Sequence, residues 1–311
     1  MLKLKKIETF YSLFRETVRD PRVKGNVLAL TLGRSGRGST IASALKQLNN
    51  MYKFKVSLKP RLVLNTYRGH ENRAFFCKKT GKYGITRIYW KLYNKKLKSE
   101  ISSAICLAGK YDFFVTARNE NINLRPVGLE ICETSSFFDP IYTIPNGWKY
   151  SLRECIKKFM NRQFKEGILD RIHHGSLCWQ DVDWRIYESI RENLRKPLRH
   201  VGNEIGTFSS TIKKHLYDTV IPCCTTANFF FPHGYNYYNQ IFIRFNSRCE
   251  KSIISALKCL PCTTYVFPLE HDITINIFHD NINDIFRLVK KLEEKDLTED
   301  LLLSVPLISV F

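Results

Sequence analysis

Basic and hydroxyl side chains crowd one short segment near the start of the chain, and their types suit nucleic-acid chemistry. Arg34, Ser35, Arg37, Ser39 and Thr40 directly precede an apolar segment with helical spacing. Arginine can bind guanine bidentately, and hydroxyls beside helix N-terminal amides can hold phosphates. We expect these residues to contact DNA; the alternative is a solvated surface of a domain that binds a protein partner. The expected interface also includes Lys46, Lys53, Lys55, Lys59 and Arg61.

The net charge of +20 is concentrated in the first third of the 311 residues. Residues 1–100 carry 24 basic and 5 acidic side chains, whereas residues 201–311 carry 10 and 12. Such a concentration favours a polyanionic partner, and nucleic acid is the commonest, because each neutralised phosphate releases counterions. An anionic membrane surface is the alternative, but it requires a basic amphipathic helix with an aromatic face, and we identify none in the sequence.

A second cluster of hydroxyl and lysine side chains opens another apolar periodic segment. Its surroundings are less basic, because Glu204 and Asp218 lie nearby. We expect DNA contact here as well, with a structural remnant or a dimerising module as the alternative. The members of this cluster are Ser209, Ser210, Thr211, Lys213 and Lys214.

Patterns that carry catalysis or cofactor binding are missing from the sequence. Gly33-x-x-Gly36-x-Gly38 lacks the buried strand and the terminal Gly-Lys-Ser/Thr of a phosphate loop. Cys259-Leu-Pro-Cys262 has metal or redox spacing, but a tetrahedral site needs two further ligands. We expect both cysteines to be packing residues. We also expect that the protein is not an enzyme and binds no metal or cofactor. The ten cysteines, without a secretory signal, indicate reduced thiols in the cytoplasm.

Hydrophobic periodicity places the first basic segment in a three-helix unit. Helices are expected at about residues 8–19 and 23–32, and Ser39 would be the N-cap of a third. Ala29-x-x-x-Gly33 provides a small residue at a helix contact and a residue that tolerates positive φ, as a helix-turn-helix requires. Residues 54–67 alternate basic and apolar side chains, which predicts a β wing.

The next segment has the β-α-β-β order that begins a ferredoxin-like βαββαβ domain. Strands are expected at residues 74–77, 101–107 and 113–116, with a helix spanning residues 85–92. Gly109-Lys-Tyr-Asp112 joins two of these strands in a tight turn, where the aspartate can accept amide hydrogen bonds. Residues 121–148 are rich in Pro, Ser and Phe, and we expect an irregular, partly extended segment there.

The same pattern then repeats. A linker helix is expected at residues 151–166, followed by three helices beginning near Asp183, Leu198 and Ser209, which form a second helix-turn-helix. From residue 239 onward the hydrophobic period predicts a complete βαββαβ unit. The expected domains are residues 1–68 and 150–222 for the two helix-turn-helix units, and 69–149 and 223–311 for the two ferredoxin-like units.

These units together resemble two tandem copies of an Lrp/AsnC-type transcription regulator. The resemblance rests on Asp20-Pro-Arg, Ala29-x-x-x-Gly33, Ser39-Thr-Ile and Gly109-x-Tyr-Asp112 in the first copy, and on Asp183-Trp-Arg-Ile and Ser209-Ser-Thr-Ile in the second. It implies a winged helix-turn-helix followed by a ligand-sensing domain, an α+β fold. It also implies an effector site, for a small molecule such as an amino acid, at Gly109, Tyr111 and Asp112; a plain hairpin turn is the alternative. Glu270-His-Asp272 replaces this turn in the second copy.

Three functions follow from these expectations. The first is a sequence-specific, effector-responsive regulator that binds double-stranded DNA, as a homodimer or an intrachain pseudo-dimer without a membrane partner. The second is an enzyme similar to the sirohaem decarboxylases, which resemble the same two-part layout, with His173, His174 or His233 as the acid. The third is a scaffold whose winged helices bind protein. The concentrated charge favours the regulator.

Overall fold

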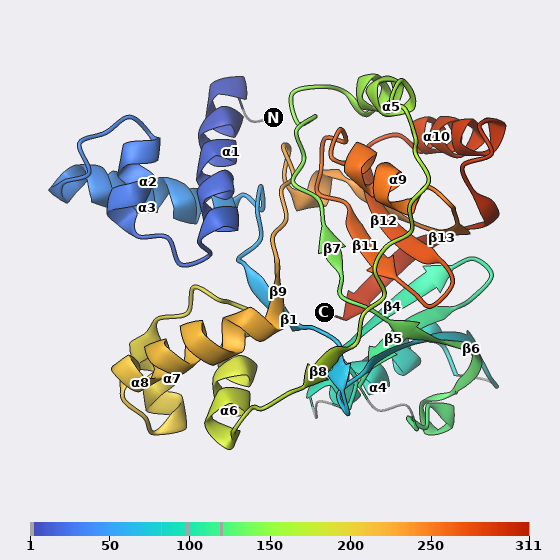
Figure 1. Ribbon diagram of the computed structural model, residues 1–311, viewed down its shortest axis with the longest axis horizontal. Helices are drawn as coiled ribbons and strands as arrows, with labels where there is room; N and C mark the ends of the chain where they lie inside the picture. Colours follow the sequence, from blue (N-terminus) through green and yellow to red (C-terminus); the bar gives the residue numbers. More distant parts are fainter. Residues whose placement is uncertain (1–2, 82, 98–99, 119–120, 311) are drawn as a thin grey trace.

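The computed structural model describes residues 3–81, 83–97, 100–118 and 121–310. Three-helix units alternate with ferredoxin-like units along the chain, each kind occurring twice (Figure 1). The fold is therefore α+β, with helix-turn-helix and ferredoxin-like domains in a duplicated arrangement, as the sequence predicts. Among the described residues, no helix is both long enough and apolar enough to cross a membrane.

The first three-helix unit has a small aromatic core. Its helices are α1 (Leu4–Arg19), α2 (Gly25–Thr31) and α3 (Gly38–Lys53). Phe10 and Phe14, four residues apart on α1, are fully buried, as helical spacing predicts. Ala29 is also fully buried where α2 meets α3, and Gly33 has a φ of +69° in the turn. These two positions confirm the predicted helix-turn-helix.

The third helix begins at Gly38, before the predicted N-cap residue Ser39. Arg37 occupies the N-cap position, and its amide donates to the Thr40 hydroxyl at 3.0 Å. The same hydroxyl donates back to the Arg37 carbonyl at 2.6 Å. Ser39 is therefore not the N-cap, because the hydroxyl at the third helical position already satisfies the free amide before the helix.

The predicted wing strand exists but has an unexpected partner. β1 (Arg61–Leu64) pairs antiparallel with β9 (Cys224–Ala227), which follows the second three-helix unit. The register joins Arg61 to Ala227 and Leu64 to Cys224. Each three-helix unit thus contributes one strand to a shared two-stranded sheet. A hairpin within residues 54–67 does not form, because the second copy offers a complementary edge.

The first ferredoxin-like unit has the strand order β6-β3-β5-β4. The helix that would follow β5 in a complete βαββαβ domain is replaced, in the described residues, by a 3₁₀ turn, Arg125–Val127. This agrees with the irregular segment predicted after residue 121. The elements are β3 (Asn72–Lys79), α4 (Ile85–Leu97), β4 (Ser103–Ala108), β5 (Phe113–Ala117) and β6 (Leu129–Phe137).

The second ferredoxin-like unit is complete, which confirms the predicted βαββαβ order. Its strand order, β13-β10-β12-β11, repeats the connectivity of the first unit. Its own two helices and α5 cover its outer face in Figure 1. The elements are β10 (Asn239–Asn246), α9 (Glu250–Leu257), β11 (Tyr265–Pro268), β12 (Ile273–His279), α10 (Ile282–Glu294) and β13 (Glu299–Val310).

The two ferredoxin-like sheets join into one nine-stranded sheet through the β4–β13 pair, and β7 (Ile141–Tyr142) adds to the β11 edge. The sheet curls so that its helix-free faces meet. The ring of Phe114 lies 5.3 Å from that of Phe242 and 5.4 Å from that of Phe267. A single bridge from Phe137 to Leu269 brings β6 beside the β11 end. The two ferredoxin-like units therefore pair edge to edge and pack face to face within one chain.

The second three-helix unit and the linker complete the chain. α5 (Leu152–Met160) is capped by Ser151 and ends earlier than the predicted linker helix. The unit itself consists of α6 (Asp181–Ile190), α7 (Leu198–Ile205) and α8 (Ser209–His215), as predicted. The short remaining elements are β2 (Tyr67–Arg68), β8 (His174–Ser176), a π turn (Leu216–Val220) and the 3₁₀ turns Ile221–Cys223 and Tyr235–Tyr237.

The chain crosses over between the units. In Figure 1 the first three-helix unit lies beside the second ferredoxin-like unit, and α6 to α8 lie near the first ferredoxin-like unit. Tyr11 of α1 accordingly lies against Trp148 and Phe230, with ring separations of 4.9 and 5.1 Å. Tyr187 of α6 accepts a hydrogen bond from Arg118, which follows β5. This exchange creates an internal junction at β1 and β9.

Candidate functional site

A cavity of about 330 Å³ lies at this junction, between the β1–β9 pair, α6 and the nine-stranded sheet. Its lining comes from both copies, so neither copy alone would form it. Half of its described lining residues are cationic or aromatic, and Glu192 is the one acidic residue among those that the structure describes. The cationic members are Lys55, Arg61, Arg118 and Arg191; the aromatic members are Phe137, Tyr142, Tyr187, Phe229, Phe231, Tyr235, Tyr265 and Phe278.

Short backbone connections position the arginines. The Leu62 amide of β1 donates to the Arg191 carbonyl at 2.8 Å, which holds the strand against the end of α6. Arg191 also pairs with Glu188 one turn earlier, at 3.2 Å. Arg61 lies 3.5 Å from Glu192, and a third of its side chain is exposed. Two carboxylates, Glu188 and Glu192, thus neutralise part of the cationic wall, which keeps an excess of positive charge from its four cationic residues.

Arg118 is held over the aromatic residues of α6. Its Nη2 donates to the Tyr187 hydroxyl at 3.0 Å, and the guanidinium lies 5.4 Å from the Tyr187 ring and 5.6 Å from that of Trp184. The Leu64 amide donates to the same hydroxyl at 3.3 Å. Arg118 Nε is buried and has no hydrogen-bond partner within the described residues. Tyr187 therefore fixes the arginine while part of the guanidinium's donor capacity stays unused.

The aromatic wall is a cluster of contacting rings, some stacked and some edge to face. Tyr142 and Tyr265 are stacked at 4.4 Å, and Phe229 lies 5.3 Å from Tyr142. Phe231 lies 4.7 Å from Phe278. Burial raises the pKa of Tyr142 and of Tyr265 well above the usual phenol value. These phenols are therefore neutral near pH 7 and act as hydrogen-bond donors.

A glycine allows the aromatic-rich loop between β9 and β10 to approach the C-terminal end of α3. Gly234 has a φ of +88°, and a Cβ there would lie 2.7 Å from the Phe54 carbonyl oxygen. The close approach lets the Tyr235 amide donate to the Lys55 carbonyl at 2.9 Å. Lys55 and Tyr235 thereby meet at the cavity rim, although they come from different copies.

A second cavity of about 500 Å³ adjoins the first and shares Ser102, Arg118 and Arg191 with it. Its lining also includes Lys95 and Glu100, which form an ion pair, and Glu188, which pairs with Arg191. The two shared arginines therefore lie where the cavities meet.

The histidines proposed as acids lie elsewhere, outside the lining of both cavities. His174 Nε2 is 2.7 Å from an Asp139 oxygen, beside β8. His173 packs on Phe138 with rings 5.0 Å apart, and His233 packs on Tyr237, also at 5.0 Å. The structure thus does not bring these three residues to the cavity.

Most DNA-contact candidates of the first unit are on or near the open side of α3. Ser35, Arg37, Ser39, Lys46 and Lys53 are exposed, as is Lys59. Arg34 is partly buried and donates to Ser43 at 2.6 Å, and Thr40 serves as the capping hydroxyl. Arg61 and Lys55 instead line the cavity. The candidate set is therefore divided between an outer helix face and the inner site.

In the second unit the candidates also face solvent. Ser209, Ser210, Thr211, Lys213 and Lys214 are exposed on α8. The helix is short and passes directly into the π turn. Phe208, its N-cap residue, is 83% exposed. The second unit thus presents fewer cations and a bare aromatic ring in the corresponding place.

The three effector candidates are engaged in internal contacts. Tyr111 is buried and donates to Glu133 at 2.7 Å. Asp112 accepts from the Lys79 amide at 2.7 Å. A Cβ on Gly109 would lie 2.4 Å from the Ser304 hydroxyl, so glycine lets the turn approach β13. All three lie outside the lining of the two cavities, and their contacts are those of a structural turn.

That turn is linked to the corresponding turn of the second copy. Arg244 of β10 binds Glu133 and donates from Nε to Asp272 at 2.7 Å. The Asp272 carbonyl accepts from the Leu269 amide at 2.9 Å, as the Asp112 carbonyl accepts from Leu107 at 2.7 Å. Arg244 holds the pKa of the Glu133 carboxyl below its usual value. Glu270-His-Asp272 is therefore the structural counterpart of the first turn, joined to it through Arg244.

Cys259 and Cys262 are free and buried. Burial raises the pKa of Cys262 well above the usual thiol value. Within the ranges that the structure describes, no group of three or more His, Cys, Asp or Glu side chains could hold a metal ion.

The cavity cannot be found from the sequence, because its lining residues are scattered over both copies. Arg118 and Arg191 stand in ordinary polar contexts, and Phe229 and Phe231 read as core residues. The one usable signal is the aromatic-rich segment between β9 and β10, which supplies Phe229, Phe231 and Tyr235 to the lining.

Comparison with known proteins gives fold-level matches. No family model and no curated protein sequence matches the chain. Two solved structures match it, both of the siroheme decarboxylase NirDL. The first has a TM-score of 0.45 and 11% identity, and the alignment covers 96% of this chain and 90% of that one. The second, in co-complex with an iron-uroporphyrin III analogue, has a TM-score of 0.42 and 11% identity over 94% and 90%.

The matches bear on two expectations from the sequence. The expectation that the chain is not an enzyme is wrong, because both matching structures are those of an enzyme. The regulator family expected from the sequence is matched at the level of architecture, in the helix-turn-helix and ferredoxin-like layout.

Proposed function

We propose that the protein is an enzyme that binds a flat polycarboxylate in the cavity between the two copies. One observation supports this above all: four cationic and eight aromatic side chains line the cavity, with one acidic side chain among them. Arginine forks suit carboxylates, and aromatic faces suit a planar ring. The cavity has the size and lining of a small-molecule site.

A tetrapyrrole that carries carboxylate side chains combines the two features. The matching structures are of a siroheme decarboxylase, one of them with an iron-uroporphyrin III analogue. The cavity supports the proposal by its own chemistry, and the match supplies only the compound to try. Arg118 and Arg191 would hold carboxylates where the cavities meet. The stacked rings of Tyr142 and Tyr265, with Phe229 edge-on beside them, would contact the macrocycle.

We propose decarboxylation as the reaction. The bond between a side-chain carbon and its carboxyl carbon breaks, CO₂ leaves, and the electron pair left on the carbon takes up a proton. Tyr187 is the donor that the geometry favours, because its oxygen already accepts from Arg118 and Leu64 and its own proton is free for a third group. Bulk solvent restores that proton. The aromatic wall excludes water from the reacting carboxylate.

The test is a visible-absorbance titration with iron-uroporphyrin III, followed by mass spectrometry for loss of carboxyl groups. We expect saturable binding, and we expect Arg118→Gln to weaken it roughly 10- to 100-fold, since a hydrogen bond to a charged group contributes about 1.5–3 kcal/mol. The matched control is Arg153→Gln, an exposed arginine of α5 outside both cavities. Equal binding by the wild type and both variants would rule out the cavity as the site.

A second candidate function is sequence-specific binding of duplex DNA by α3. Residues 21–70 contain ten Lys and Arg and no Asp or Glu, and α3 and its N-cap present Arg37, Ser39 and Lys46 to solvent. The N-terminal end of such a helix reads base edges in the major groove. With α8, each chain would have two different DNA-recognition helices, whether it acts alone or as a homodimer.

For DNA binding we expect a steep fall of affinity with added salt in a mobility-shift titration against a genomic fragment pool, because bound phosphates release counterions. Arg37→Ala should weaken specific binding by roughly 1–3 kcal/mol if the side chain reads a base. The control is Arg199→Ala, an exposed arginine of α7. Binding that is indifferent to salt, or equal in both variants, would argue against a reading role for α3.

A further inference from the structure

We propose that the outer face of α4, with the turn before it, is a binding strip for single-stranded nucleic acid, separate from both the cavity and α3. The strip consists of Tyr83, Arg87, Trp90, Lys91 and Tyr93. It goes beyond the proposed enzyme and the duplex-reading helix, and it also corrects the sequence interpretation, which identified no basic helix with an aromatic face.

Helical spacing explains why the strip exists. Ile88 and Leu92 point inward and are fully buried against the first ferredoxin-like sheet. Arg87, Trp90 and Tyr93, at intervals of three, share the opposite face. Trp90 is 56% exposed, and its ring meets that of Tyr93 edge to face at 5.7 Å. A large tryptophan surface is thus left uncovered on a well-packed helix.

Two cations of the strip lie over the Tyr83 ring, and Lys91 also donates to the Pro126 carbonyl at 2.9 Å. Arg87 lies 4.6 Å and Lys91 4.3 Å from the centre of the Tyr83 ring. In the part of the chain that the structure describes, neither of them forms an ion pair. The sequence of residues 72–99 contains nine Lys and Arg and no Asp or Glu. The nearest acidic side chain along the chain, Glu100, is paired with Lys95. The strip therefore carries a net positive charge around open aromatic faces.

This strip is distinct from the α3 surface. Figure 1 shows α4 against the first ferredoxin-like sheet, well away from α1, α2 and α3. The concentrated charge of the first third, which the sequence presents as one cationic segment, is therefore divided between two surfaces. A molecule bound to α3 would therefore not contact the cationic side chains of α4.

Charge complementarity selects a polyanion, and the rings select one with exposed π faces. Bases of a single strand can stack on Trp90 and Tyr93 while Arg87 and Lys91 meet the phosphates. Bases inside a duplex offer no free face. A membrane-bound helix would have to bury an apolar face in lipid, but the apolar face of α4 already packs against the protein core. Single-stranded nucleic acid is therefore the occupant that fits.

The test is a fluorescence-anisotropy titration of the full chain with a labelled oligothymidylate of about 12 nucleotides. We expect binding that weakens with salt, and about tenfold lower affinity for Trp90→Ala, from the loss of one stacked base. Phe286→Ala is the matched control, because Phe286 is an aromatic residue of α10 with a similar exposure of 54%. Arg87→Gln should also weaken binding, whereas Arg153→Gln on α5 should not.

Arg37→Ala separates this strip from α3, and the single-strand affinity should stay within about twofold of wild type if the two surfaces act independently. The proposal is overturned if Trp90→Ala and Phe286→Ala bind alike, or if Arg37→Ala removes single-strand binding. It is also overturned if the chain does not bind the oligonucleotide, or if it instead binds phosphatidylserine vesicles with a blue-shifted tryptophan emission that is lost in Trp90→Ala. Failure of the iron-uroporphyrin titration has no bearing on any of these outcomes.

Discussion

Two histidines, His233 and His279, each keep a buried Nδ1 that has no hydrogen-bond partner among the described residues. Burial lowers the pKa of both imidazoles below the usual 6.5, although Asp280 opposes this shift. The folded state therefore favours the neutral form of both imidazoles. In the unfolded chain the same rings take up a proton at a higher pH.

The stability of the protein should fall on acidification below about pH 6.5. The unfolded state binds more protons in that window, so the free energy of unfolding rises with pH and levels off above it. His279→Gln should give a shallower fall than wild type, whereas His200→Gln, at an exposed position of α7, should keep the wild-type slope. Urea unfolding at a series of pH values measures this. Identical slopes for both variants would show that His279 is not the responsible group.

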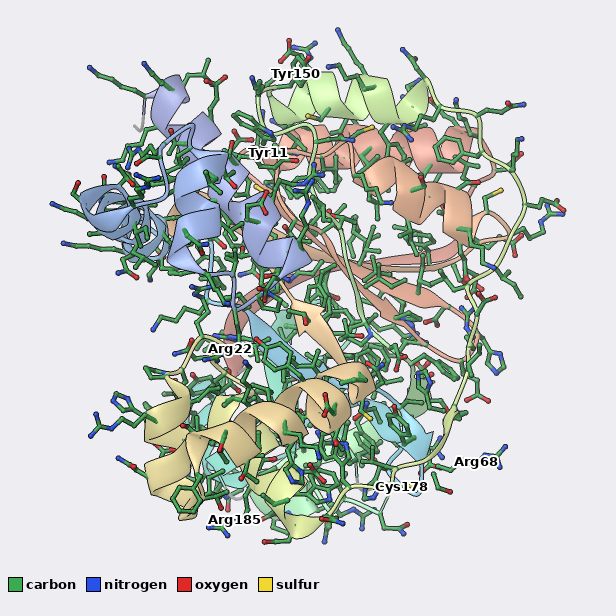
Figure 2. The ribbon with its side chains drawn as sticks, turned by 60° about the vertical axis from the view of Figure 1, so that its left-hand side comes forward. Tyr11, Arg22, Arg68, Tyr150, Cys178 and Arg185 are labelled. Carbon is green, nitrogen blue, oxygen red and sulfur yellow. The ribbon has the colours of Figure 1, made fainter. Side chains whose placement is uncertain are left out.

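At the scale of elements, the loops after α1 and α6 hold the two three-helix units together by reciprocal contacts. Arg22 donates to the carbonyls of Leu194 and Lys196 in the other unit. Arg195 donates back to the carbonyls of Pro21, at 2.8 Å, and Val23, at 3.1 Å. Figure 2 shows Arg22 at this junction. The pairing has the form of a pseudo-twofold contact, like that of β1 with β9.

Removal of one of these arginines should loosen the junction. We expect Arg195→Ala to lower the free energy of unfolding by about 1–3 kcal/mol, because two carbonyls lose a charged donor. Arg199→Ala, exposed on α7 nearby in the chain, is the control and should change it little. The Arg22→Ala and Arg195→Ala pair should be non-additive in a double-mutant cycle of urea unfolding. Strict additivity would mean that the two loops do not act as one contact.

At the scale of the whole molecule, duplication creates the cavity. The crossover places each three-helix unit beside the ferredoxin-like unit of the other copy, so that Arg61 and Phe137 of the first copy face Tyr265 and Phe278 of the second. In the described residues the first unit also lacks its second helix, which leaves α4 as the main cover of its sheet there. The outer faces of the two ferredoxin-like sheets therefore differ, whereas the cavity between the copies is shared by both.

Short-range patterns in the sequence are enough to predict the local elements of this protein. Helical and strand periods are short-range, so the buried face of α1, the turn at Gly33 and the complete βαββαβ order after residue 239 could all be predicted from the sequence. The departure of the first copy after residue 121 was also visible, because no apolar helical period occurs there. The capping of α3 by Thr40 differs from the prediction of Ser39, because two adjacent hydroxyl residues could each cap the helix and the sequence does not choose between them.

Long-range packing sets which copy each element lies against, and this is visible in the fold and not in the sequence. The pairing of β1 with β9, the β4–β13 junction and the cavity all join residues that are far apart in the chain, and no period encodes such a choice. Lys55 and Arg61 therefore read as wing cations in the sequence and lie at the cavity in the fold. Side-chain type sets what a residue can do, whereas long-range packing sets what it meets.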